Sequence, residues 1–364
     1  MNTSKHMLTA IELAKKGELS VQPNPMVGCV IVKGEEIIGS GWHKMYGSHH
    51  AEVNAINDCL KKFGIENGKK LLRRSHMFVT LEPCSITNNT PPCTNKILEY
   101  EISKVTYGAK DPNPKIFGKG LQQLKSKGVT VEPSIFKDEC QTLLKIFAVN
   151  QLKKRPFISV KIAVSSDSFL APIKATKQHF ISGAKSRSNV QSIRKKHRAI
   201  LIGGNTLRID QPSLHIKNQK IKNSDQPVKI ILTNRNPSKT QLKNLMSRYS
   251  RIIFVSNKKI LVPVKENIEN LVIEKIGKPF LHDLLKKLLA QKISSILVEP
   301  GQGMFQLFQK HNLIDELIVF RSNTCLKDGL PPMQSSLDFE NYLKRLTLVT
   351  SEKIGSDIKS TFKI

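Results

Sequence analysis

The sequence has no apolar run close to the ~20 residues that a membrane-spanning helix needs, so we do not expect a membrane protein. It also has no signal-peptide core near its start, because Lys5, Glu12, Lys15 and Lys16 interrupt the first helical pattern. Aromatic residues are few, with one tryptophan and five tyrosines, which leaves little material for base-stacking surfaces. These absences favour a soluble, cytoplasmic enzyme or binding protein.

Acidic residues are scarce as well: 29 Asp and Glu stand against 58 Lys and Arg, giving a net charge of +29. A basic surface attracts phosphate, either on nucleic acid or on small substrates. The lysines are spread along the chain rather than clustered, which is typical of a general compositional bias and makes nucleic acid the less favoured partner. Six cysteines without a secretory signal indicate metal ligation or burial rather than a disulfide framework.

The 364 residues suggest two domains, at roughly 100–200 residues each. Both halves alternate helical and strand patterns, which predicts an α/β layered fold. A connecting helix is expected over residues 138–153, ended by Arg155 and Pro156. We place the domains at residues 1–147 and 148–364.

The last residues of the chain have a different pattern. Residues 346–364, with Gly355 midway, predict a closing hairpin.

The strongest chemical signal is His50-Ala51-Glu52 followed by Pro83-Cys84 and Pro92-Cys93. One imidazole and two thiolates are three ligands for tetrahedral Zn²⁺, and three ligands leave a fourth position for water. Zinc lowers the pKa of that water towards ~7. Glu52, two residues after the histidine, can relay its proton without binding the metal. This is the logic of zinc nucleobase deaminases.

Each part of this pattern has a simpler explanation when it stands alone. An isolated H-A-E is usually the start of a surface helix, and two cysteines are usually buried thiols. Their order, with a proline before each cysteine and Glu82 before the first proline, favours a zinc site formed by His50, Cys84 and Cys93.

These motifs resemble those of the bifunctional riboflavin-biosynthesis deaminase–reductase family. Eight residues separate Cys84 and Cys93 in T-L-E-P-C…T-P-P-C, which is the family's spacing. Residues 23–28 match its P-N-P-x-V-G segment, and residues 111–114 match its D-P-N-P loop. The resemblance implies a cytidine-deaminase-like three-layer domain followed by a dihydrofolate-reductase-like α/β domain.

The resemblance also implies that Asn24 and His43 position a pyrimidine ring. Turn formation is the alternative for Asn24 and for the D-P-N-P segment, because these residues form turns in any case. The loop between the cysteines departs from the family: residues 85–89 read S-I-T-N-N, without the family's histidine and basic residue.

The second half matches the family's reductase domain, beginning with K-x-A-x-S-x-D at residues 161–167. The resemblance implies substrate contacts by Arg194, Leu214, Lys217 and Glu299, and cofactor contacts by Ser182, Thr206, Asp210 and Gly301. The chain departs from the family at several positions, namely Ser168 for glycine, His179 or Phe180 for tryptophan, Gln211 for aspartate, Lys217 for arginine and Pro300 for glycine.

Physical chemistry agrees with these roles in part. An arginine such as Arg194 can bind a ribose phosphate through two hydrogen bonds. Glu299 ends a buried strand, where an unpaired carboxylate would be costly. Pro300 removes an N–H that could meet a cofactor phosphate. The alternative is that Arg194 and Asp210 are solvated charges.

We therefore expect an enzyme of riboflavin synthesis that uses Zn²⁺ and NADPH. By resemblance, it deaminates 2,5-diamino-6-(5-phosphoribosylamino)pyrimidin-4(3H)-one and then reduces the ribosyl group, giving 5-amino-6-(5-phosphoribitylamino)uracil. The alternatives are a deaminase with a non-catalytic reductase-like domain, or a tRNA-type nucleic-acid deaminase. The expected partner is a small phosphorylated pyrimidine, and homo-oligomer formation is left open.

Overall fold

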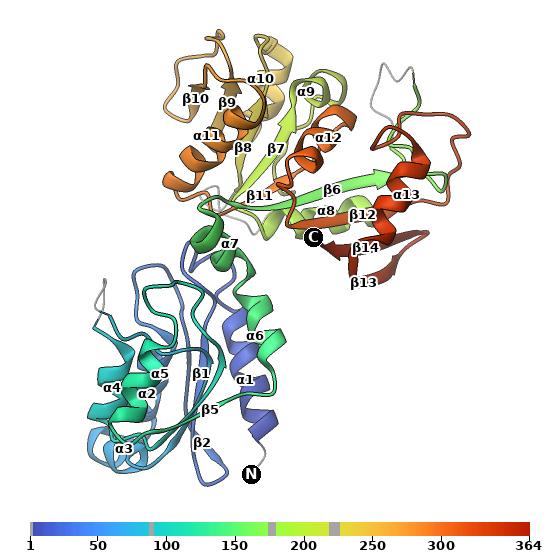
Figure 1. The fold of residues 1–364 in the computed structure, drawn as a ribbon. Helices are drawn as coiled ribbons and strands as arrows, with labels where there is room; N and C mark the ends of the chain where they lie inside the picture. Colours follow the sequence, from blue (N-terminus) through green and yellow to red (C-terminus); the bar gives the residue numbers. More distant parts are fainter. Residues whose placement is uncertain (1–2, 87–90, 174–179, 218–225) are drawn as a thin grey trace. The chain divides into compact units, whose positions relative to one another are not determined.

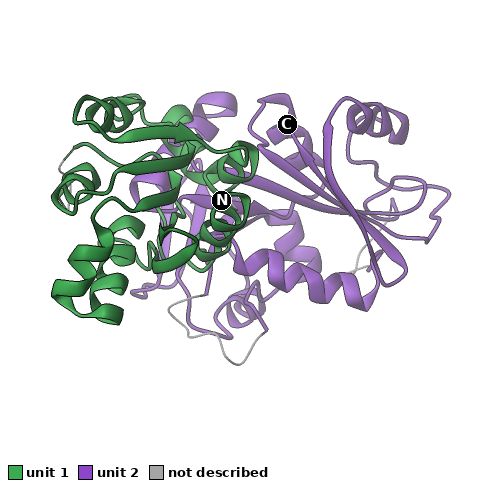
Figure 2. Cartoon of the chain, turned by 90° about the horizontal axis from the view of Figure 1, so that it is seen from below, with its two compact units in different colours: residues 1–155 green, residues 156–364 purple. Residues whose placement is uncertain are grey.

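The computed structural model describes residues 3–86, 91–173, 180–217 and 226–364. The chain divides into two compact units, residues 1–155 and 156–364 (Figure 2). This division lies after the expected one at 147/148, because helix α7 (Lys145–Lys153) crosses that point and belongs to the first unit. Residues 87–89 and His179, singled out from the sequence, lie outside the described residues.

Unit 1 is built around a five-stranded sheet in the order β2-β1-β3-β4-β5. Strand β1 pairs antiparallel with β2 and β3, whereas β3, β4 and β5 run parallel. The elements of unit 1 are α1 (Thr3–Lys15), β1 (Gly28–Lys33), β2 (Glu36–Trp42), α2 (Ala51–Phe63), α3 (Ile65–Leu72), β3 (His76–Leu81), α4 (Cys93–Glu99), β4 (Lys104–Ala109), α5 (Lys119–Ser126), β5 (Thr130–Pro133), α6 (Lys137–Leu143) and α7 (Lys145–Lys153).

Helices cover both faces of this sheet, α1 and α6 on one side and α2, α4 and α5 on the other (Figure 1). Strand β3 is buried along its whole length, as expected for a strand covered on both faces. The packing of α1 on β1 requires glycine, since a Cβ on Gly28 would lie 1.9 Å from the carbonyl oxygen of Ala10. The three-layer arrangement expected for the first domain is confirmed.

Unit 2 contains a nine-stranded sheet in the order β10-β9-β8-β7-β11-β6-β12-β14-β13. The strands from β10 to β12 in this order are parallel, and the hairpin β13–β14 adds antiparallel to β12. The elements of unit 2 are β6 (Phe157–Val164), α8 (Ala184–Lys195), β7 (Ala199–Gly203), α9 (Gly204–Asp210), β8 (Val228–Leu232), α10 (Lys239–Leu245), β9 (Ile252–Ser256), β10 (Ile268–Val272), α11 (Gly277–Ala290), β11 (Ser295–Val298), α12 (Gln302–Lys310), β12 (Glu316–Arg321), α13 (Ser336–Lys344), β13 (Thr347–Ile354) and β14 (Asp357–Lys363).

Successive residues of a strand point to opposite faces, and β7 shows this directly. Ala199 and Leu201 join the core under α11, α12 and α13, whereas Ile200 and Ile202 join the core under α9 and α10. Helix α8 packs on the same sheet through a smaller cluster. The α/β fold expected for the second domain is confirmed, and the carboxyl ends of its parallel strands lie at one edge.

Two local expectations have different outcomes. The hairpin expected over residues 346–364 is confirmed as β13–β14, with Gly355 at φ +67° in the turn. The single helix expected over residues 138–153 is instead two helices, α6 and α7, and the break lets Leu143 and Leu144 both pack into the core of unit 1. Among the described residues, no helix combines the length and apolarity needed to cross a bilayer.

Candidate active sites

Three side chains named from the sequence converge in unit 1. His50 is the N-cap residue of α2, Cys84 follows β3, and Cys93 opens α4. Their ligand atoms all lie within 4.8 Å of one another, with His50 Nδ1 3.3 Å from Cys93 Sγ and 3.6 Å from Cys84 Sγ. An imidazole nitrogen and two sulfurs from three elements form the donor set of a tetrahedral zinc site that keeps an open position. These residues therefore fit the metal.

The surroundings of Cys84 favour its thiolate. The backbone N–H of Cys93 donates to Cys84 Sγ at 3.4 Å. A hydrogen bond from the Cys93 thiol, together with one from His50, lowers the pKa of Cys84 to about 4 against the opposing effect of burial. Thiolate, not thiol, is the metal-binding form.

Glu52 lies in the first turn of α2 and is only 4% exposed. Burial is the main cause that raises the pKa of its carboxyl to about 6, and His50 opposes the shift. Such a group can both accept and donate a proton near neutral pH. Glu52, His50 and Cys84 line one pocket of about 380 Å³.

Asn24 and His43 line the same pocket and are bonded to each other. Asn24 Nδ2 lies 3.2 Å from His43 Nε2, and His43 Nδ1 lies 3.0 Å from the carbonyl oxygen of His49. The carbonyl can only accept, so Nδ1 carries the proton and Nε2 accepts from the amide. Burial lowers the pKa of His43, which favours this neutral form. The two side chains are fixed beside Glu52, and their contact with a ligand stays a prediction.

Glu82 holds the D-P-N-P loop and the residues after it next to the segment that carries Cys84. Its buried carboxylate accepts hydrogen bonds from the backbone N–H groups of Asp111, Gly118 and Gly120, at 3.3, 2.9 and 3.1 Å. A Cβ on Gly120 would lie 1.9 Å from the carbonyl oxygen of Pro83, so this close approach requires glycine. The loop is thereby held against the cysteine-bearing segment.

Helix α7 supplies two pocket residues that the sequence analysis did not identify, Phe147 and Gln151. They are four residues apart and so share one face of the helix. From the sequence this segment is expected only to connect the domains, because a phenylalanine and a glutamine in a short helix give no signal of a site. Within the described residues, no lysine or arginine lines this pocket.

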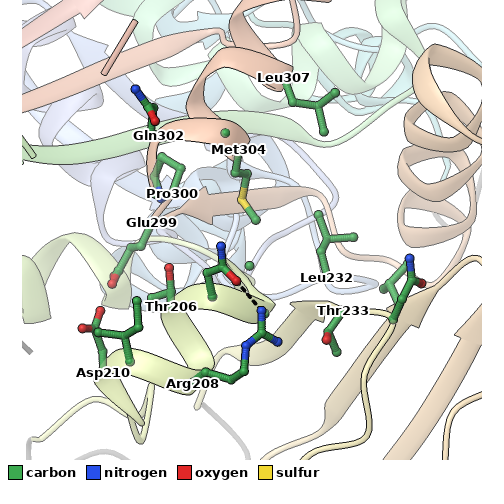
Figure 3. Close-up of a pocket in the computed structure, with 18 of the residues that line it drawn as sticks. Thr206, Arg208, Asp210, Leu232, Thr233, Glu299, Pro300, Gln302, Met304 and Leu307 are labelled. Atoms are coloured by element: carbon green, nitrogen blue, oxygen red, sulfur yellow. Dashed lines mark hydrogen bonds between the residues drawn. The ribbon is translucent and has the colours of Figure 1, made fainter. Parts of the chain in front are cut away.

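Unit 2 has its own pocket of about 850 Å³, shown in Figure 3. It lies at the carboxyl ends of β7, β8, β9 and β11, the usual ligand position in an open α/β sheet. Four of the residues predicted to contact substrate or cofactor line it, namely Thr206, Asp210, Glu299 and Gly301. The first turns of α9 and α12 also line it, and their N–H groups have no partners within their helices. The pocket therefore fits a dinucleotide with a pyrophosphate.

Pro300 does not remove a helix donor. Gly301 is the N-cap residue of α12 and Gln302 its first helical residue, so Pro300 precedes the helix. The N–H groups of the first turn belong to Gln302 and the residues after it. The substitution of the family glycine by proline therefore leaves the N–H groups in the first turn of α12 in place.

The remaining named residues lie outside this pocket lining. Ser182 is buried and its carbonyl accepts from Arg187, Leu214 is buried in the core, and Lys217 is exposed. Arg194 is 13% exposed and pairs with Glu299, so it is not a solvated charge. Ligand contacts by these four residues stay predictions.

Glu299 has the partners that its burial requires. Burial alone would raise the pKa of its carboxyl, but the charge and hydrogen bonds of Arg194, with Lys161 nearby, outweigh that effect and lower it. Asp210 differs, because burial and then the charge of Glu299 raise the pKa of its carboxyl.

Ser168, which stands where the family has glycine, has a backbone conformation that glycine adopts more easily. Its φ of +70° lies in the left-handed region that favours glycine. Its hydroxyl bonds Glu340 and accepts from Arg321 Nη1 at 2.7 Å. These bonds fix the Ser168 hydroxyl between Glu340 and Arg321.

Comparison with known proteins agrees with this geometry in both units. A family model described as the cytidine and deoxycytidylate deaminase zinc-binding region matches residues 1–109, and one described as the RibD C-terminal domain matches residues 156–360. The chain is similar to the curated riboflavin biosynthesis protein RibD of Buchnera aphidicola, with 32% identity over 97% of this chain and 96% of the relative. It is 36% identical to the protein of that name from Actinobacillus pleuropneumoniae, over 84% and 79% of the two chains.

Solved structures give the same result. The chain superposes on a deaminase/reductase from Thermotoga maritima with a TM-score of 0.82 and 30% identity, covering 99% of this chain and 98% of the other. It superposes on a RibD structure from Acinetobacter baumannii with a TM-score of 0.81 and 30% identity, covering the same shares of the two chains.

Proposed function

The chain belongs to the RibD family of riboflavin-biosynthesis proteins, which combine a deaminase with a reductase, and from this premise we propose the reaction and the residues that serve it. Its cofactors are Zn²⁺ and NADPH. Unit 1 deaminates 2,5-diamino-6-(5-phosphoribosylamino)pyrimidin-4(3H)-one. Unit 2 then reduces the ribosyl side chain, which yields 5-amino-6-(5-phosphoribitylamino)uracil. The related structure from Thermotoga maritima is named for a deaminase and a reductase of this substrate class.

The convergence of His50, Cys84 and Cys93 beside the buried Glu52 carries the deaminase half of the proposal. When bound to these ligands, Zn²⁺ supplies the Lewis acidity that lowers the pKa of a water molecule. Glu52 takes a proton at its carboxylate and passes it to the departing amino group. Its raised pKa, about 6, suits a group that must both accept and release a proton.

The other pocket residues of unit 1 orient the ring. The bonded pair Asn24 and His43 presents a neutral, fixed polar surface. Phe147 offers an apolar face, and Gln151 offers an amide that can donate and accept. Together they hold the pyrimidine beside Glu52.

In unit 2, NADPH supplies a hydride. Thr206, Asp210 and Gly301 would surround the bound cofactor, and the N–H groups in the first turns of α9 and α12 would hold its pyrophosphate. Glu299, at the end of β11, accepts hydrogen bonds from hydroxyl groups of the sugar chain, and Arg194 keeps it charged and oriented. Leu214 and Lys217 complete the substrate side, and Ser182 completes the cofactor side.

The alternatives are not favoured. A tRNA-type deaminase leaves the second unit unexplained, since the RibD C-terminal domain model matches residues 156–360. A scaffold without reductase activity disagrees with the intact first turn of α12 and with the open pocket beside Glu299.

The experiment supplies the diaminopyrimidine ribosyl phosphate to purified protein, with and without NADPH, and identifies the products by mass. The proposal expects the deaminated ribosyl compound alone without NADPH, and the ribityl compound with it. No deamination under either condition contradicts the first half, and deamination without any NADPH-dependent product contradicts the second.

A further inference from the structure

Two loops that follow neighbouring strands form the wall of the unit 2 pocket beside Glu299. Leu170 and Ala171 belong to the loop after β6, and Leu330 belongs to the loop after β12; all three line the pocket. Strand β6 lies between β11 and β12 in the sheet, and β11 ends immediately before Glu299. The two loops therefore border the end of the pocket where, in the proposed reductase, the sugar chain lies.

Backbone hydrogen bonds join these two loops. The N–H of Leu170 donates to the carbonyl oxygen of Leu330 at 2.8 Å, and the N–H of Leu330 donates to the carbonyl oxygen of Ala171 at 2.8 Å. The carboxylate of Asp167, in the first loop, accepts from two backbone N–H groups of the second loop at 3.1 and 2.8 Å. A shift of one loop therefore moves the other, so the position of the wall depends on what anchors the pair.

The anchor is a cluster of three side chains, Ser168, Arg321 and Glu340, from the first loop, the end of β12 and α13. Glu340 Oε1 accepts from the hydroxyl of Ser168 and from Arg321 Nη2, the latter at 2.7 Å. Arg321 Nη1 donates to Ser168 Oγ at 2.7 Å, which closes a triangle of hydrogen bonds. Figure 1 shows α13 beside the carboxyl end of β6. The cluster thus ties the first loop to a helix outside the pocket.

Ser168 is the residue through which α13 reaches the loop. Its side chain is buried, and its φ of +70° is a conformation that glycine adopts at lower cost. Residues held in such conformations by their surroundings cluster at functional sites. Glu340 itself does not belong to the described lining of the pocket. It can therefore influence a ligand only through the loop that Ser168 holds.

Resting on the proposed reductase function, we propose that Glu340 is a positioning residue of the reductase and acts through Ser168. The loop that carries Leu170 and Ala171 sets how closely the sugar chain approaches the nicotinamide of NADPH. The cluster adds no chemical step to the hydride transfer. Its effect is on geometry, and geometry matters because a misplacement of about 1 Å can lower a rate by roughly 100-fold.

The test measures the reductase kcat, the KM for NADPH and the unfolding free energy of full-length variants. Glu340→Ala removes the carboxylate, whereas Glu340→Gln keeps a carbonyl oxygen that can still accept from Ser168. The kcat should fall by about 3–30-fold in Glu340→Ala, as expected for misplaced reactants, and by less in Glu340→Gln. The KM for NADPH should stay within about two-fold of the parent value, because the first turns of α9 and α12 are unchanged.

Glu269→Ala is the matched control for a lost ion pair. Glu269 pairs with Arg251 at 2.6 Å, with side-chain exposures of 35% and 38%, close to the 37% and 28% of Glu340 and Arg321. Neither Glu269 nor Arg251 belongs to the described lining of the pocket. This variant should lose unfolding free energy much as Glu340→Ala does and keep the parent kcat. Equal losses of kcat in the two variants would show a general effect of stability and would overturn the proposal.

A double-variant cycle tests whether Glu340 acts through Ser168. Ser168→Gly removes the hydroxyl and suits the φ of this position, so the variant should fold. Its kcat should fall by about 2–10-fold, the range for one hydrogen bond. Glu340→Ala should then add less in this background than in the parent protein.

Effects of the two substitutions that multiply independently would overturn the assignment while leaving the reductase function in place. A parent-like kcat in both Ser168→Gly and Glu340→Gln would do the same, even if Glu340→Ala fails to fold. A parent protein that shows no NADPH-dependent reduction would overturn the reductase function and the assignment with it.

Discussion

Arg194 and Glu299 form a bidentate ion pair, with Arg194 Nε 2.7 Å from Glu299 Oε1 and Arg194 Nη2 2.8 Å from Glu299 Oε2. The two residues come from α8 and from the segment after β11. Both are largely buried, with side-chain exposures of 13% and 17%. The guanidinium that the sequence assigned to substrate phosphate therefore already holds a carboxylate of the protein.

This pair predicts a large stability effect. Arg194→Met leaves the buried carboxylate of Glu299 without its main partner, so unit 2 should lose about 3–5 kcal/mol of unfolding free energy. Arg194→Lys keeps the positive charge but cannot make both parallel hydrogen bonds. It should therefore lose less unfolding free energy than Arg194→Met. Denaturation followed by far-UV circular dichroism measures both, since the single tryptophan, Trp42, lies in unit 1. Equal stability of Arg194→Met and the parent protein would show that the pair contributes little.

The ligand assignment predicts zinc content. The protein as purified should hold about one zinc per chain, and Cys84→Ser should lose it, because a hydroxyl is a much poorer zinc ligand than a thiolate. Cys325→Ser is the control, since Cys325 is exposed and lies in unit 2. Metal analysis after dialysis measures the zinc content of the two variants and of the parent protein. Retention of zinc by Cys84→Ser contradicts the assignment.

Helix α7 should contribute to the deaminase and not merely connect the units. Gln151→Ala should raise the KM for deamination by about 2–10-fold, the range for one neutral hydrogen bond, and leave the reductase rate unchanged. Leu152→Ala is the control on the same helix, because Leu152 is 61% exposed and does not line the pocket. Steady-state kinetics of the two reactions compare the variants. An unchanged deamination KM in Gln151→Ala would remove this role.

His76 predicts acid sensitivity of unit 1. Burial, assisted by the charge of Lys104, lowers the pKa of its imidazole to about 4 from 6.5. Between pH 6.5 and about 4 the unfolded chain binds a proton that the folded chain does not. The unfolding free energy therefore falls as the pH drops through this window, by up to about 3 kcal/mol.

The comparison is with His76→Gln, which keeps a polar group near Thr106 Oγ1, the partner of His76 Nε2 at 2.8 Å. Trp42 fluorescence during urea unfolding at several pH values reports unit 1. The variant should lose less stability than the parent protein from pH 6.5 to 4. An identical pH dependence of the unfolding free energy in the two proteins would mean that His76 does not cause the acid sensitivity of unit 1.

The sequence predicts best what depends on local spacing. His50, Cys84 and Cys93 belong to short motifs whose order suffices to indicate a metal site. Contacts between distant segments carry no such signal. The pairing of Arg194 with Glu299 depends on which strands are neighbours in the sheet. Gln151 also carries no such signal, because its place in the pocket depends on the direction that α7 takes after the break at Leu144.

The most direct measurement is a pair of rates on one variant, Glu52→Gln. The amide preserves the size of the side chain and leaves the three metal ligands in place, so zinc content should persist. Because the amide cannot accept a proton, deamination should fall by about 10²–10⁴-fold. Every described residue that lines the reductase pocket belongs to unit 2, so NADPH oxidation with the already deaminated ribosyl intermediate should continue at the parent rate. Near-normal deamination, or loss of both rates in a folded variant, would contradict the account of two separate sites.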